Sequence, residues 1–123
     1  MPYIIGLSLG GAGLLYVGVS QAQWGIITLV LVFFSHACSG TSWVFSTTLL
    51  QRRTDNDWMG RVAGTDNLII VLTMGVSTIG AGYILEEDLL SLRDILLLTG
   101  MIQITVGALW LLLASPREKR FLA

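Results

Sequence analysis

Hydroxyl side chains recur at helical spacing within the stretch 24–50, in a chain that is otherwise mostly apolar. They are separated by steps of seven, four, three and four residues, and such steps return to one side of an α-helix. A stripe of this kind forms either a packing seam or the wall of a wet cavity, because small polar side chains join helices as readily as they line pores. Both interpretations stay open for Thr28, Ser35, Ser39, Ser42 and Ser46.

His36, the only histidine, lies about a quarter-turn from this stripe. Histidine gains or loses a proton near neutral pH, so a buried histidine can relay protons. His36 has no carboxylate within the same stretch, which favours a structural role. We keep His36 together with the five hydroxyl residues as candidates for a pathway through the protein.

The sequence contains no pattern typical of catalysis or of metal binding. His36 and the single cysteine, Cys38, lie on different helix faces and have no further ligands beside them. No nucleophile and base recur at a spacing that suits a reaction. We therefore predict that the protein is not an enzyme and that it uses no cofactor or metal.

The composition indicates that the lipid bilayer is the solvent of this chain. Of its 123 residues, 54% are hydrophobic and only 12% are charged, whereas soluble domains carry about 25% charged residues. No Lys, Arg, Asp or Glu occurs before Arg52. No basic cluster with interleaved aromatic residues is present, so we expect no nucleic-acid partner.

The apolar stretches predict an all-α polytopic membrane protein with four transmembrane helices. A helix crosses the hydrocarbon in about 20 residues, and loops must lie outside it because their backbone groups need water. Polar residues at 20–23 break the first charge-free region, Gly64 to Asn67 could cap the third helix, and Ser115-Pro116 ends the fourth. The expected spans are about 2–19, 24–50, 62–85 and 93–114.

The charges predict the orientation of these spans. Four crossings place the loop 51–61 and the tail 115–123 on one side of the membrane. Positive charge stays in the cytoplasm during insertion, so we expect a cytoplasmic loop and tail, both termini in the cytosol, and location in the inner or plasma membrane. The basic residues on this side are Arg52, Arg53, Arg61, Arg117, Lys119 and Arg120, and only Arg93 lies on the other.

Small residues predict how the helices pack. Gly6, Gly10 and Gly13 share one sector of the first span, and Gly100 and Gly107 share a face of the fourth. Such faces let backbones approach closely in lipid. Gln103 lies on the same face of the fourth span, where an interhelical hydrogen bond is the favoured role.

The third span carries small residues on one side and polar residues on another. This pattern indicates that protein surrounds it, and therefore that helices beyond these four take part. Asp66 lies at its cytoplasmic mouth, near enough to Arg61 for an ion pair at the rim.

The segment from Leu49 to Ile84 resembles two late helices of the major facilitator superfamily, and most of all the branch of the enterobactin and macrolide exporters. In that branch Leu-Leu-Gln ends one helix and Gly-Arg-Val opens the next, after a short cytoplasmic turn. The final helix of this chain is also similar to that of the branch. The matching residues of the loop motif are Gln51, Gly60, Arg61 and Gly64, with Asp66 following. The turn 54–57 and Met59 depart from the proline and arginine common there.

This resemblance implies that the four spans are the ninth to twelfth helices of a twelve-helix fold. It also implies secondary active export of a small molecule, of the drug or siderophore type, by alternating access. The helix 24–50 would then line the central cavity, and Arg61 and Asp66 would belong to the cytoplasmic side that opens and closes. The implied partners are the lipid bilayer, the small-molecule substrate, and the remaining helices of the same transporter or of a split partner.

A stand-alone four-helix membrane protein is the alternative, either as a dimeric transporter or as a scaffold. Small multidrug resistance proteins have a glutamate in their first helix, whereas the stretch 2–19 contains no acid. A scaffold would leave the hydroxyl stripe without a purpose. Transport by a facilitator-like protein is therefore the preferred hypothesis.

Overall fold

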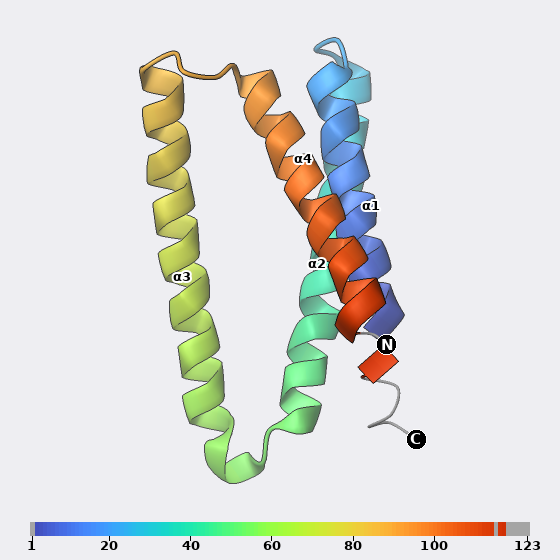
Figure 1. Cartoon of the computed structure of the whole chain (residues 1–123), viewed down its shortest axis with the longest axis vertical. Helices are drawn as coiled ribbons and strands as arrows, with labels where there is room; N and C mark the ends of the chain where they lie inside the picture. The colour runs from blue at the N-terminus through green and yellow to red at the C-terminus, as the bar shows by residue number, and fades with distance from the viewer. Residues whose placement is uncertain (1, 115, 118–123) are drawn as a thin grey trace.

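The computed structural model describes residues 2–114 and 116–117, and every regular element in these ranges is helical. Each of the four helices is long and apolar enough to cross a membrane, which confirms the prediction of an all-α chain with four such elements. Their order along the chain is α1 (Pro2–Gln21), α2 (Ile26–Arg53), α3 (Asn56–Glu86) and α4 (Leu92–Leu109), and a π-helical turn, η1 (Trp110–Ala114), continues α4 (Figure 1).

The helices run alternately up and down. The α1–α2 and α3–α4 connections lie at one end of the molecule, and the α2–α3 turn lies at the other (Figure 1). The start of α1 and the end of η1 both point toward the end that holds the α2–α3 turn. Arg52, Arg53 and Arg61 flank this turn, whereas Arg93 lies in the first turn of α4 at the other end. Lys119 and Arg120, which the charge pattern also assigns to the first side, lie outside the described residues.

The segment 51–61 is mostly helix, so the predicted loop is much shorter than expected. The turn between α2 and α3 consists of Thr54 and Asp55 alone. Thr54 Oγ1 donates to the Leu50 carbonyl at 2.8 Å and closes the end of α2. Asp55 precedes α3 in an extended conformation and Asp57 lies in its first turn, where a carboxylate stabilises the positive end of the helix dipole.

The predicted cap of the third helix at residues 64–67 was wrong, because α3 starts at Asn56. Thr65 donates its hydroxyl to the Arg61 carbonyl one turn earlier at 2.8 Å, a bond that a threonine inside a helix makes. α2 and α3 have 28 and 31 residues, about 42 and 46 Å of helix, against a hydrocarbon of about 30 Å. Both helices are therefore longer than a single crossing requires.

Glycine holds α1 against α4, as the small-residue faces predict. A Cβ built on Gly100 would lie 2.7 Å from the Gly13 carbonyl oxygen, and one on Gly13 would lie 2.6 Å from the Gly100 carbonyl oxygen. A Cβ on Gly107 would lie 2.8 Å from the Gly10 nitrogen. The two backbones therefore touch along several turns, and dispersion is strong at that separation.

Hydroxyl groups and a few apolar side chains hold α1 against α2. Ser42 Oγ donates to the Ile5 carbonyl at 3.0 Å, and Ser8 Oγ donates to Ser42 Oγ at 3.2 Å. The buried apolar side chains in the described residues are Pro2, Ile5, Ala12, Val19 and Leu49. The core is thus a thin layer on the two sides of α1, which is the central helix of the group.

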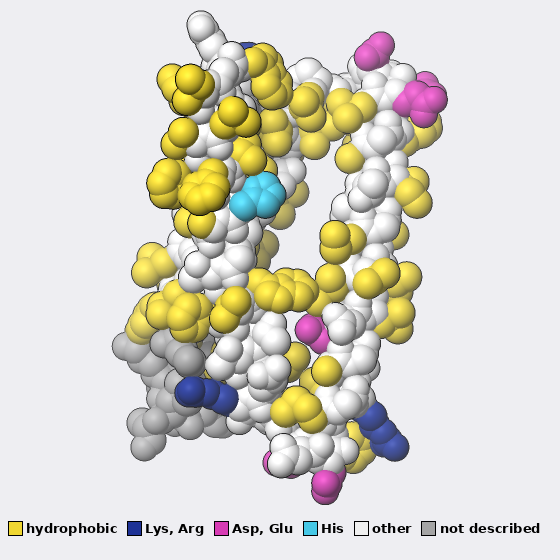
Figure 2. Space-filling model, turned by 180° about the vertical axis from the view of Figure 1, so that it is seen from behind, with side chains coloured by type: hydrophobic (Ala, Val, Ile, Leu, Met, Phe, Trp, Pro, Cys, Tyr) yellow, Lys and Arg dark blue, Asp and Glu magenta, His cyan; other side chains and the backbone are white. Residues whose placement is uncertain are grey.

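α3 stands apart from the other three helices and is joined to them at its two ends (Figure 1). None of its residues is buried. Exposed apolar side chains are spread along the helices on the face that Figure 2 shows, and Val76 and Ile79 on α3 are 72% and 74% exposed. Such surfaces suit lipid or further helices rather than water. That further helices surround α3 stays a prediction.

Candidate functional site

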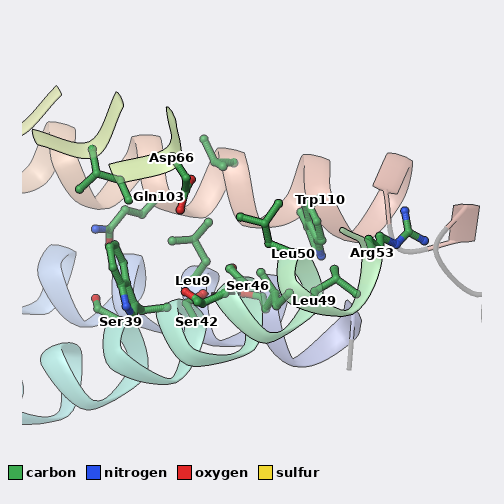
Figure 3. Close-up of a pocket in the computed structure, with 15 residues that line it drawn as sticks. Leu9, Ser39, Ser42, Ser46, Leu49, Leu50, Arg53, Asp66, Gln103 and Trp110 are labelled. Carbon is green, nitrogen blue, oxygen red and sulfur yellow. Dashed lines mark hydrogen bonds between the residues drawn. The ribbon is translucent and has the colours of Figure 1, made fainter. Parts of the chain in front are cut away.

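A cavity of about 650 Å³ lies between α3 and the other helices. Apolar side chains supply most of its wall, and Trp43 on α2 and Trp110 at the start of η1 add two indole rings. Its polar lining includes three serines from the stripe, Asp66 from α3 and Gln103 from α4 (Figure 3). Ser39 and Gln103 lie at the middle of their spans, 26–53 and 92–114. The cavity therefore reaches from the centre of the helices toward the α2–α3 end, where Arg53 lines it.

The structure divides the hydroxyl stripe into two parts. Thr28, Ser35 and Ser42 recur every seven residues and are buried; Ser42 bonds to α1, whereas Thr28 Oγ1 donates to the Gln23 carbonyl before its own helix at 3.0 Å. Ser39 and Ser46 face the cavity together with Ser42. Both interpretations of the stripe thus describe some of its members, and Ser42 takes part in the seam and in the cavity wall.

Two substitutions in the seam should have different effects on stability. Ser42→Ala removes the hydrogen bond to Ile5 and should lower the free energy of unfolding in detergent micelles by about 0.6 kcal/mol. Ser35 Oγ is buried and has no partner among the described residues, so Ser35→Ala should leave stability unchanged or raise it. Loss of helicity on titration with sodium dodecyl sulfate measures both. A larger loss for Ser35→Ala than for Ser42→Ala would contradict this account of the seam.

His36 lies on the exposed side of α2 and does not line the cavity (Figure 2). Its Nδ1 lies 3.0 Å from the Val32 carbonyl oxygen, one turn earlier in the same helix. His36 is therefore separated from Ser39 and Ser42, with which the sequence analysis grouped it.

The predicted interhelical hydrogen bond of Gln103 was wrong within the described part of the chain. Its Oε1 is buried without a hydrogen-bond partner. The reason is its position on α4: the side chain faces the cavity rather than the glycine contact with α1.

The residues of the loop motif separate in space. Gln51, Gly60 and Gly64 are exposed and line neither the 650 Å³ cavity nor a smaller one beside it. Arg61 lines this smaller cavity of about 350 Å³, and Asp66 lines both. Asp66 is thus a shared wall residue that lines the same cavity as Ser39 and Gln103. Its place at a cytoplasmic mouth stays a prediction.

Arg61 and Asp66 form no ion pair in the described ranges. The Arg61 guanidinium carbon lies 5.0 Å from the centroid of the Trp58 ring instead, a cation–π contact one turn apart on α3. Asp66 makes no hydrogen bond or ion pair with another described residue. Asp66 as a residue is partly buried, and it lines the cavity.

Trp43 was missed by the sequence analysis because only hydroxyl residues were followed along α2. It lies four residues after Ser39, which places it on the same side of a helix. Extending the same periodicity to large side chains would have found it. Nothing in the periodicity of α2 alone identifies Asp66 or Gln103, since they come from other helices.

Comparisons with protein family models, with curated proteins and with solved structures find no match to this chain.

The arrangement suits reversible binding of a small molecule. Ligand cavities measure about 300–1,000 Å³ and combine apolar walls with a few placed polar groups, and this cavity has both properties. Within residues 2–114 and 116–117, no three His, Cys, Asp or Glu side chains gather as metal ligands would. The chemistry on offer is a carboxylate, an amide oxygen, hydroxyl groups and indole rings.

Proposed function

We propose that this chain is a multi-pass protein of the inner or plasma membrane and part of a secondary-active exporter of small molecules. The observation that carries the proposal is the cavity itself. It holds Asp66 and Gln103 without partners, next to serines at the middle of a candidate span. Polar groups placed so in a membrane are costly, and they are typically found along substrate pathways.

The proposal includes the correspondence of α1 to α4 with the ninth to twelfth helices of a major facilitator fold. Supporting it, α3 has no buried residue and is polar on one side, as a helix with further helices around it would be. The arginines next to the α2–α3 turn support a cytosolic turn. Both termini are then cytosolic as well.

The cavity suggests how access would alternate. Asp66 and Ile70 contribute the α3 side of its wall, and the other helices contribute the rest. A tilt of α3 relative to the other helices would therefore change the opening. The short connections at Thr54–Asp55 and at residues 87–91 are where backbone angles can absorb such a tilt. In this proposal the other half of the transporter supplies the second wall and the energy coupling.

Export is tested by deleting the coding segment for this chain in its own host cell and restoring it at the same locus. The probes are ethidium as a cation, fluorescein as an anion and Nile red as a neutral molecule. We expect deletion to raise the steady-state content of at least one probe and wild-type restoration to lower it again. If none of the three changes, export of molecules of this size is contradicted.

A stand-alone protein of two copies is the second candidate, because the unburied surface of α3 could equally pack against a second copy. The reading frame upstream of Met1 distinguishes the two arrangements. Eight further spans in frame would support a single twelve-helix transporter, and their absence would favour a split partner or a dimer.

A further inference from the structure

We propose that the cavity binds an organic cation with an apolar body, with Asp66 as its counter-charge and Gln103 as a hydrogen-bond acceptor. This inference rests on the proposed export function and names the chemical class of its substrate. It follows from the charges, the unpartnered atoms and the rings that face one space.

The uncompensated charge in the cavity is negative. Two charged side chains line it, Asp66 and Arg53. Arg53 is exposed, belongs to the last turn of α2, and already has an interaction of its own. Asp66 is partly buried and has no partner among the described residues. A positively charged ligand would neutralise this carboxylate, whereas an anion would face it across an apolar space.

One residue of the cavity wall, Gln103, carries a buried and unpartnered acceptor atom. Gln103 Oε1 is shielded from solvent and receives no hydrogen bond, a condition that buried oxygens rarely tolerate without a ligand or water. It lies on α4, and Asp66 lies on α3, so the two acceptors approach the cavity from different helices (Figure 3). An ammonium or amino group can donate to a carboxylate and to an amide oxygen, whereas a carboxylate or phosphate ligand offers neither of them a donor.

The rings and the apolar wall suit the rest of such a ligand. Trp110 Nε1 already donates to the Pro2 carbonyl at 2.7 Å, so its indole contributes surface rather than a free donor. Trp43 brings a second indole to the cavity, and indole faces attract cations. Leu9 and Ile70 are among the apolar side chains that would surround the body of the molecule.

The depth of Asp66 strengthens the attraction. Asp66 lies about 11 Å along α3 from the centre of the apolar stretch 62–85, within the hydrocarbon half-thickness of about 15 Å. Charge interactions are stronger there than at an exposed surface because less water screens them. An ion pair with a bound cation would therefore replace a costly unpaired carboxylate.

Binding is tested on the purified full chain in dodecyl maltoside micelles, with ethidium as the probe and equilibrium dialysis as the measurement. Ethidium carries a positive charge, amino donors and an aromatic body. We expect saturable binding that Asp66→Asn weakens at least ~10-fold and Gln103→Leu weakens about 5-fold. Asp57→Asn, on the same helix but outside both cavities, should change it less than ~2-fold.

Circular dichroism of each variant shows that the helices persist, so that a loss of binding reports the site. Saturable binding of fluorescein in preference to ethidium would overturn the proposal, as would unchanged ethidium affinity in Asp66→Asn. The two proposals fail separately. Export of fluorescein or Nile red that does not depend on Asp66 would support the export function and contradict the cation site. Ethidium binding that depends on Asp66, together with an unchanged steady-state content of all three probes in the deletion strain, would support the cation site and contradict export.

Discussion

Replacing Gly100 by alanine should lower the free energy of unfolding by about 1–3 kcal/mol, although alanine is normally the better helix former by about 0.5–1 kcal/mol. The new Cβ would lie 2.7 Å from the Gly13 carbonyl oxygen, 2.8 Å from Val17 Cγ2 and 3.0 Å from the Val17 nitrogen. Two of these three atoms belong to the backbone, so no side-chain rotation relieves the clash. α1 and α4 would have to separate, and the dispersion energy of their contact would fall.

Gly40→Ala is the matched control for this change. Gly40 lies within α2, is exposed, and has no atom within 4 Å of a built Cβ. The same substitution there should be neutral or stabilising. Unfolding of both variants in mixed micelles, followed by helical ellipticity, gives the comparison. Equal effects at Gly100 and Gly40 would show that the close approach of α1 and α4 does not hold the assembly together.

Ser39→Trp should abolish most of the export of whichever probe the wild-type chain removes from the cell. Ser39 lies at the middle of α2 and faces the cavity, so an indole at this position would fill much of the space that the substrate needs. We expect at least a ~10-fold lower export rate, since a misplaced or excluded substrate loses the contacts that bind it. The measurement is the rate of probe efflux from preloaded cells, with the amount of the protein followed by immunoblot.

Two variants separate a filled cavity from a damaged fold. Ser39→Ala keeps the space open and should retain at least about half of the wild-type efflux rate. Ser39 makes no hydrogen bond to another described residue, and a small substitution at a cavity wall, outside a packed core, has a mild effect. Ala37→Trp adds the same ring to an exposed side of α2, away from the cavity. Efflux by Ser39→Trp that equals that of Ala37→Trp would mean that the stripe is a packing seam alone.

The number of helices and the close glycine contacts could be predicted from sequence because both depend on local patterns. Charge-free apolar stretches set the spans, and Gly6, Gly10 and Gly13 repeat at helical spacing wherever the helix happens to pack. Glycine spacing in the sequence marks faces suited to close approach but does not show which helices meet. That pairing depends on connection lengths and on competition among several small-residue faces.

The candidate site was only partly predictable for the same reason. Ser39, Ser42 and Ser46 follow from the periodicity of one helix, whereas Asp66 and Gln103 join them through the packing of α3 and α4. The start of α3 at Asn56 moved Asp66 more than two turns into a helix, when charge alone suggested a residue near its mouth. That residues 56–61 are helical could not be predicted from the sequence, because charged side chains are equally common in a loop and at a solvated helix end.

The start of α4 carries a capping pattern in the sequence from which its first residue could have been predicted. Ser91 Oγ accepts from the Asp94 nitrogen at 3.2 Å, and the Ser91 nitrogen donates to Asp94 Oδ2 at 3.0 Å. A serine followed three residues later by an acidic residue is a recognised start of a helix. It fixes the beginning of α4 at Leu92, within one residue of the predicted span.

The account depends most on four crossings with the α2–α3 turn in the cytosol, and cysteine labelling in intact cells tests this directly. In a Cys38→Ala background, single cysteines replace Gln23, Glu87, Asp57 or Arg117, all of which are exposed. A membrane-impermeant maleimide should label the cysteines at positions 23 and 87 from outside, and those at 57 and 117 only after the membrane is opened. Labelling of position 57 or 117 in intact cells, or protection of 23 and 87, would contradict the account.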